Sequence, residues 1–227
     1  MSDFIAPAII GGVSLGALGF LWYRSVARRN ATERVLFASG FRPAAAEDAR
    51  IDFSLTPQWP EGRGIVFLRV FSKKGPDVTL TVADVRCFEI TGARLGRGGS
   101  AMRADEIEQT VVSCRFRRRQ IPRFILCARE RADEILLLVK GEQRTVTGDA
   151  AFDAAHFVIG PGDPAAPGFL SAAVRREIDA LLGLIVCAGH QSVVAFRQGV
   201  VLPPADLRAL LKLLGTIVSE AGRSPLS

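Results

Sequence analysis

The first long apolar run of the chain covers residues 4–23 and holds twenty residues without a charged side chain. At about 1.5 Å of rise per residue, a helix of that length spans about 30 Å, the thickness of the hydrocarbon core of a bilayer. The run therefore predicts one N-terminal transmembrane helix. A cleaved signal peptide and a buried core helix are the alternatives. The signal peptide is disfavoured because acidic Asp3 precedes the run and aromatic residues and arginines end it.

The end of this run carries the side chains expected at a membrane–water interface: Trp22, Tyr23, Arg24, Arg28 and Arg29. Positive charge after a membrane helix and none before it places the following residues in the cytoplasm. We therefore expect a single-pass protein of the bacterial inner membrane, with its N-terminus outside and its C-terminal domain in the cytoplasm.

Four small residues recur at helical spacing within the same run: Ala8, Gly12, Gly16 and Gly19. The spacing of Gly12 and Gly16 lets membrane helices approach each other closely. The stripe is a candidate packing face for another transmembrane helix. The alternative is that glycine is simply common in this chain.

Alternating and continuous apolar runs predict strands beyond a linker at residues 43–50. In the first half these strands cover residues 51–55, 65–71, 78–90, 110–116 and 123–128. We expect one hairpin turning at residues 73–77 and a second around the basic tip at residues 117–119. Short helices are expected at residues 102–108 and 133–140.

From residue 151 the pattern changes to a strand at 156–160, an amphipathic helix at 170–182 and a hairpin of strands 184–188 and 192–197. Pro203 and Pro204 open a last helix with an apolar stripe. The fold class is therefore α+β: one transmembrane helix, then a mostly antiparallel sheet domain with packed helices. We expect an anchor with its cytoplasmic extension (1–40), a β-rich subdomain (41–144), an α+β subdomain (145–222) and a tail (223–227).

The chain is basic, with a formal net charge of +6, and its most pronounced charged feature is a run of arginines: Arg115, Arg117, Arg118, Arg119 and Arg123. A basic surface attracts anionic lipid, nucleic acid and acidic protein alike. Few aromatic residues interleave these arginines, and no nucleic-acid-binding signature is present. We therefore expect anionic lipid head groups or an acidic partner surface, and no nucleic acid. The alternative is a solvated hairpin tip.

Side chains that could carry catalysis are few. The glycine-rich stretch at 92–100 lacks the lysine and the spacing of a phosphate loop. His156 lies in an apolar strand and His190 in a turn, so an enzyme built around either one is an alternative. The four cysteines lie far apart in apolar runs, which is typical of buried, reduced thiols. We predict no catalytic residue, no cofactor and no metal site.

Several short segments of the C-terminal half occur together in one known family. They are Gln-Thr-Val-Val at 109–112, Ile-Pro-Arg-Phe at 121–124 with Leu126, Phe-Asp at 152–153, Phe-Val at 157–158, and 193–196 leading to Pro-Pro-Ala-Asp-Leu-Arg at 203–208. Over residues 109–220 or so, the chain resembles an uncharacterised family of bacterial single-pass membrane-anchored proteins. The sequence departs from that family at residues 131–150, where the usual aromatic-rich segment is missing. The resemblance implies the fold and adds no catalytic residues.

These features together predict a non-catalytic accessory or scaffolding subunit. It would dock on a larger integral membrane protein complex, respiratory, photosynthetic or transport-related, through its helix and its basic domain. A membrane-bound enzyme of unknown reaction and an anionic-lipid-binding module are the alternatives.

Overall fold

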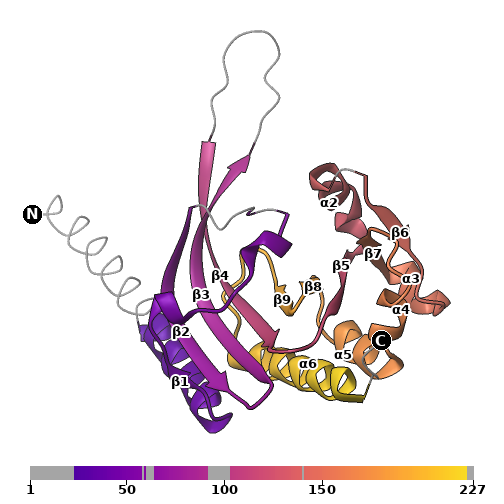
Figure 1. Ribbon diagram of the computed structural model, residues 1–227. Helices are drawn as coiled ribbons and strands as arrows, with labels where there is room; N and C mark the ends of the chain where they lie inside the picture. The colour runs from indigo at the N-terminus through magenta and orange to yellow at the C-terminus, as the bar shows by residue number, and fades with distance from the viewer. Residues whose placement is uncertain (1–22, 58, 60–63, 92–102, 140, 224–227) are drawn as a thin grey trace, which may run out of the picture.

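The computed structural model describes residues 23–57, 59, 64–91, 103–139 and 141–223. Within these residues one antiparallel sheet has the strand order β1-β2-β3-β4-β9-β8-β5-β7-β6. Its strands are β1 (Arg42–Pro43), β2 (Ile65–Lys74), β3 (Val78–Thr91), β4 (Arg103–Phe116), β5 (Ile121–Ala128), β6 (Gln143–Thr145), β7 (His156–Gly160), β8 (Ile185–His190) and β9 (Ser192–Phe196). The sheet is bent, with β2–β4 on one side and β5–β7 on the other (Figure 1). The α+β character and the antiparallel sheet are as predicted.

The two longest strands, β3 and β4, form a hairpin paired in register from Val78↔Phe116 to Thr91↔Arg103. Residues 102–108 were expected to form a short helix, and this prediction is wrong, because residues from Arg103 onward continue the β4 ladder. Pairing along the whole of β3 outweighs the weak local helix preference of this segment.

The predicted hairpin between residues 110–116 and 123–128 is also wrong. β4 pairs with β9, β5 pairs with β8, and β8 pairs with β9, so two strands lie between β4 and β5. The buried strands β8 and β9 need a partner on each side to satisfy their backbone groups. Because β5 pairs with β7 and β8, the sheet is continuous across residue 145, and the division into subdomains there stays a prediction.

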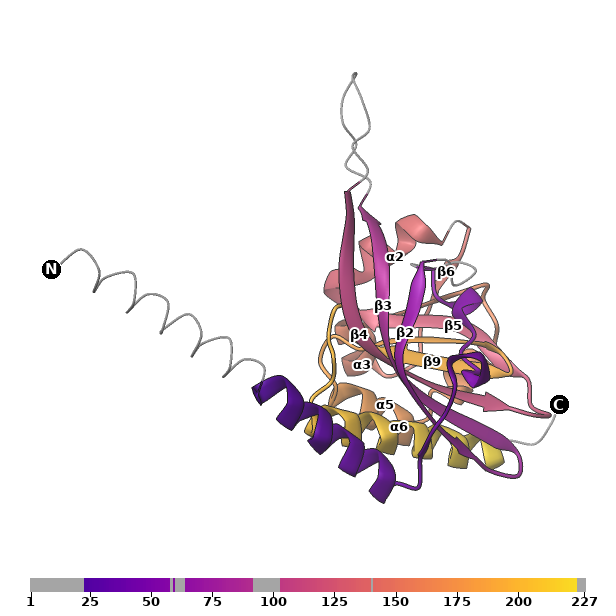
Figure 2. The ribbon, with the colours of Figure 1, turned by 90° about the vertical axis from the view of Figure 1, so that its left-hand side faces the viewer.

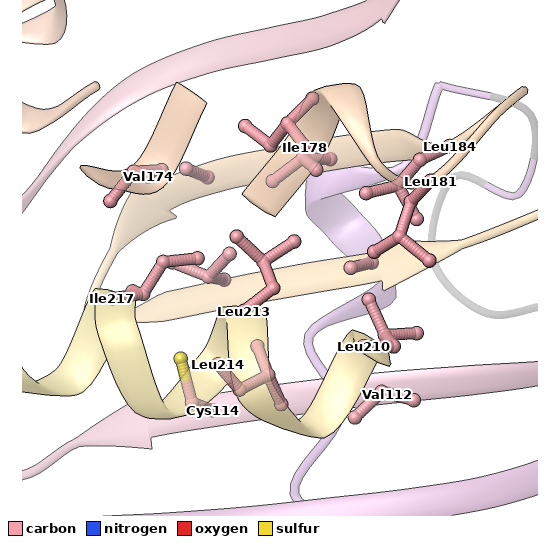
Figure 3. Close-up of a cluster of buried hydrophobic side chains, with 14 of the residues drawn as sticks. Val112, Cys114, Val174, Ile178, Leu181, Leu184, Leu210, Leu213, Leu214 and Ile217 are labelled. Carbon is pink, nitrogen blue, oxygen red and sulfur yellow. The ribbon is translucent and has the colours of Figure 1, made fainter. Parts of the chain in front are cut away.

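Helices cover one face of the sheet (Figure 2). They are residues 23–38, α3 (Ala150–Ala155), α4 (Ala166–Phe169), α5 (Ala172–Asp179) and α6 (Pro204–Arg223). Side chains of α5 and α6 point toward each other, and Leu210 and Leu214 of α6 lie beside Val112 and Cys114 of β4 (Figure 3). Leu213 at this contact is completely buried, and burial of such a side chain contributes about 1.5–3 kcal/mol.

The opposite face is covered by a loop segment and by α2 (Ala132–Leu138). Residues 51–55 were predicted to be a strand, but they contain the short 3-10 helix η2 (Phe53–Leu55), whose start is capped by Asp52. Trp59 follows and packs on Phe196, with ring centroids 5.0 Å apart. The apolar side chains of this segment therefore fill the bend of the sheet.

A polar network joins the sheet to the N-terminal helix and to the start of α6. Arg69 donates to Asp84, with an Nε–Oδ2 distance of 2.9 Å, and reaches Glu33 of the N-terminal helix at 3.2 Å. The Thr110 hydroxyl donates to Asp84 at 2.7 Å and accepts from the Leu202 backbone N–H at 3.0 Å. This network fixes where both helices lie.

The predicted membrane anchor is corrected by the structure. None of the helices in the described residues combines the length and the apolar composition that a bilayer crossing requires. The helix at 23–38 carries charged side chains on successive turns, and the twenty-residue α6 is amphipathic, with charges on its outer side. The predictions of a single-pass fold and of a bacterial inner-membrane location are therefore wrong on this finding. Five residues named for the anchor lie outside the described residues: Ala8, Gly12, Gly16, Gly19 and Trp22.

Candidate anion-binding site

A hollow of about 420 Å³ lies where β2 and β4 end, beside the loop that precedes η2. Four cationic side chains line it, from three separate parts of the chain: Arg50, Lys74, Arg115 and Arg117. We call this feature the basic hollow. Asp48, in the short 3-10 helix η1 (Ala46–Asp48), is the one acidic residue among the described residues of its lining. The lining therefore carries four positive charges and one negative charge.

Strand register brings the two strand cations together. Lys74 of β2 lies opposite Thr79 of β3, which lies opposite Arg115 of β4. Residues directly opposite each other in a sheet point to the same face, so the two cations emerge on one face of the sheet and flank Thr79. Phe116, the next residue of β4, packs in the core on the helix-covered face. The basic hollow therefore lies on the face opposite to α6.

Backbone hydrogen bonds hold the other parts of the hollow. The Arg117 N–H donates to the Asp77 carbonyl at 2.9 Å, and the Phe116 N–H donates to the Gln191 carbonyl at 2.7 Å. On the loop side, the Ser113 hydroxyl donates to the Arg50 carbonyl at 3.5 Å. These contacts fix the backbone positions from which the cations extend, so the positive charge is arranged before any ligand binds.

The cations of the hollow differ in their ion pairing from several arginines elsewhere in the domain. Arg69, Arg86 and Arg131 each pair with a carboxylate. Within the described part of the chain, no carboxylate forms an ion pair with any of the four cations of the hollow. Uncompensated like charges held close together attract counter-ions, so the hollow is suited to an anionic group.

The structure separates the arginines that were grouped in the sequence. Arg115 and Arg117 line the hollow, whereas exposed Arg118 does not. Arg119 donates to the Gly222 carbonyl at the end of α6, and Arg123 pairs with Glu142 at 2.9 Å.

The sequence analysis missed Arg50 and Lys74. Arg50 lies 65 positions before Arg115 along the chain, and it enters the hollow only because its loop crosses the sheet. Lys74 could have been found from the alternation of β2, which sends it and its neighbour Lys73 to opposite faces.

Neither histidine lines the basic hollow. The His156 ring stacks on Phe152, with centroids 4.4 Å apart, and its Nδ1 lies 3.5 Å from a carboxylate oxygen of Asp179. His190 occupies the turn between β8 and β9 with a φ of 54°. The described residues contain no cluster of three or more potential metal ligands among His, Cys, Asp and Glu.

All four cysteines are buried and free: Cys87, Cys114, Cys127 and Cys187. Burial raises the pKa of Cys114 to about 12 and that of Cys127 to about 11. Burial, together with the neighbouring Cys127, also raises the pKa of Cys187. Protonated, inaccessible thiols are poor nucleophiles, so these side chains act as core residues, as the sequence indicated.

The described residues predicted for a membrane interface lie on the N-terminal helix and are exposed: Tyr23, Arg24, Arg28 and Arg29. A separate hollow is lined by Tyr23, Arg24 and Arg28 together with Pro204 of α6. They therefore face the seam between two helices of this domain.

The fold and the hollow define an α+β domain with a preformed basic site on a bent antiparallel sheet. No family model, no curated protein and no solved structure matches the chain. The resemblance described for residues 109–220 therefore rests on its short segments alone and stays a prediction.

Proposed function

We propose that this protein is a non-catalytic accessory or scaffolding subunit that binds an acidic surface of a partner protein complex through the basic hollow. The observation that carries this proposal is the convergence of four cations that form no ion pair with a described carboxylate. Charged groups of this kind supply specificity and fast association more than raw affinity.

A protein partner suits the hollow better than a flat charged surface does. The cations extend from a loop, from two strand ends and from the turn after β4, and they surround a recess of about 420 Å³. A protruding loop with Asp or Glu side chains can enter such a recess and contact several cations at once. Lys74 and Arg115 lie two strand spacings apart, about 10 Å, which is close to the Debye length of about 8 Å at physiological salt, so salt screens their fields only in part.

Affinity purification of the full-length chain from its own cells, followed by mass spectrometry, tests the proposal. The hollow variant replaces three cations of the lining by glutamine: Arg50→Gln, Lys74→Gln and Arg115→Gln. The matched control removes the same charge from exposed arginines outside the hollow: Arg42→Gln, Arg118→Gln and Arg176→Gln.

We expect the same partner proteins, in constant proportion, with the unaltered chain and with the control variant. The hollow variant should retain about tenfold less of these partner proteins, which corresponds to a loss of about 1.4 kcal/mol in binding free energy. Equal retention by both variants would refute the proposal. Binding of the purified chain to vesicles with anionic lipid, lost only in the hollow variant, would replace the protein partner with a lipid surface.

A further inference from the structure

A continuous groove follows the seam between the N-terminal helix (residues 23–38) and α6, which lie side by side in Figure 2. It consists of three adjoining hollows of about 570, 370 and 400 Å³. The first and second share Ala31, and the second and third share Ser39 and Arg208. We call it the helix groove.

The lining of the helix groove combines small or apolar residues, which we call the floor residues, with cations. The floor residues include Ala27, Ala31, Ala38, Leu211 and Gly215. The cations are Arg24, Arg28, Arg34, Lys73, Arg208 and Lys212. Among the residues that the structure describes, no acidic residue lines any of the three hollows.

Glu177 of α5 pairs with one groove cation, Lys212, at 2.9 Å, whereas two other acidic residues of the neighbouring helices pair with cations outside the groove. Glu33 of the N-terminal helix pairs with Arg69 of the sheet at 3.2 Å, and Asp206 of α6 pairs with Arg197 at 2.5 Å. Among the described residues, the guanidinium groups of Arg28 and Arg208 have no ion-pair or hydrogen-bond partner. Arg28 and Arg208 therefore present positive charge that the described carboxylates do not neutralise.

We propose that the helix groove docks an amphipathic helix of a partner protein whose polar edges carry Asp and Glu. Small floor residues let a third helix approach at the usual interaxial distance of about 8–10 Å, and its apolar face then covers the floor. The described part of the N-terminal helix is about 24 Å long at 1.5 Å per residue, so a docked helix of about four turns matches it. Carboxylates on both edges of that helix would meet the cations on both sides of the groove.

A second copy of this chain is a poorer occupant. The exposed charges of α5 are mixed, with Arg176 near Asp179, and α2 has only seven residues. No helix in the described residues offers a long face of acidic residues alone. The occupant we propose is therefore a different protein, and the groove is a second docking surface on the face opposite to the basic hollow.

A synthetic peptide can probe the groove before the natural partner is known. The probe has about 18 residues, with leucine and alanine on one face and glutamate at both edges, so that it forms a helix of about 27 Å. Its control carries glutamine in place of each glutamate. Binding to the full-length chain is measured by fluorescence anisotropy, and amide chemical shifts locate the site.

Two glycines of α6 supply a matched pair of variants. A Cβ added at Gly215 meets no atom within 4 Å, and Gly215 lines the groove, so the side chain of Gly215→Leu extends into it. A Cβ added at Gly222 also meets no atom within 4 Å, but Gly222 lies near the end of α6, outside the groove. Both changes remove a glycine from a helix, so neither is expected to unfold it.

We expect the glutamate peptide to shift residues 27–39 and 208–215 and to bind about tenfold more weakly to Gly215→Leu. Gly222→Leu should stay within about twofold of the unaltered chain. Absence of binding, equal binding of the glutamine peptide, or equal weakening by both glycine variants would overturn the proposal. Self-association or binding to phosphatidylserine vesicles that Gly215→Leu abolishes would also overturn it, because another occupant would then fill the groove.

The basic hollow provides an independent comparison. The hollow variant, Arg50→Gln with Lys74→Gln and Arg115→Gln, should bind the glutamate peptide as the unaltered chain does. Loss of peptide binding in that variant would place the peptide in the basic hollow and refute docking in the helix groove, while the proposed function would stand.

Discussion

Replacing Lys74 by glutamine is expected to stabilise the fold while it weakens binding in the basic hollow. Lys74 and Arg115 flank Thr79 on one face of three paired strands. Neighbouring strands are about 4.8 Å apart, so the two residues are separated by about 10 Å. Two unit charges at that distance repel each other by about 0.4 kcal/mol in water and by about 1.7 kcal/mol at an effective dielectric constant of about 20.

Both side chains are exposed, so the lower figure applies. The free energy of unfolding should therefore rise by about 0.4 kcal/mol in Lys74→Gln, and the melting temperature by about 1–2 °C for a domain of this size. Cations that repel each other lower the stability of the fold. A protein is expected to keep such cations at a site where ligand binding requires them.

Thermal and urea unfolding of the full-length chain at about 10 mM and about 1 M salt measures this effect. The Debye length falls from about 30 Å to about 3 Å between these conditions, so the gain should disappear at high salt. Lys74→Arg, which keeps the charge, is the control and should show no gain. A loss of stability in Lys74→Gln at low salt, or a gain that persists at high salt, would refute the reasoning that the hollow contains uncompensated repulsion.

Three further outcomes follow from the core of the domain. Asp84→Asn removes the charge that Arg69 contacts beneath the N-terminal helix, so urea unfolding should show a loss of about 3 kcal/mol; an unchanged midpoint would mean that the network is dispensable. Gly160→Ala places a Cβ 2.8 Å from the Arg123 carbonyl oxygen and should cost about 1–3 kcal/mol, whereas Gly168→Ala, with no atom within 4 Å of its Cβ, should be neutral. The pKa of Cys127 is raised from 9.0 to about 11, so the folded state keeps its proton where the unfolded state loses it. The contribution of this thiol to the free energy of unfolding is then fully present below pH 9 and is lost as the pH rises toward 11. If the free energy of unfolding falls equally between pH 9 and 11 in Cys127→Ala, this assignment is wrong.

Local periodicity was sufficient to predict the elements whose structure depends mainly on nearby residues. The alternation at residues 78–90 predicted β3, and the two short runs around residues 189–191 predicted the hairpin of β8 and β9. The apolar stripe after Pro204 predicted α6. In each case the spacing of the apolar side chains determines which face of the element is buried, and the neighbouring elements determine only what that face packs against.

Strand order was decided by tertiary structure. β4 and β5 follow each other in sequence with a basic turn between them, yet β9 and β8 separate them in the sheet. A short connection between two strands favours a hairpin. Its length gives no information about two later strands that are fully buried and need partners on both sides. The helix expected at residues 102–108 failed for the same reason, because the partner strand that extends β4 is not visible in a local window.

The sequence by itself determined that the domain is basic, that its cysteines are core residues and that Arg115 and Arg117 belong to one charged segment. Only the tertiary structure decided that Arg50 and Lys74 join those two arginines, while Arg119 and Arg123 turn to other partners. It likewise brought the N-terminal helix beside α6. Charge is a property of each residue, but an uncompensated field requires several residues to be close together with their neutralising partners absent, and that distance is set by the fold.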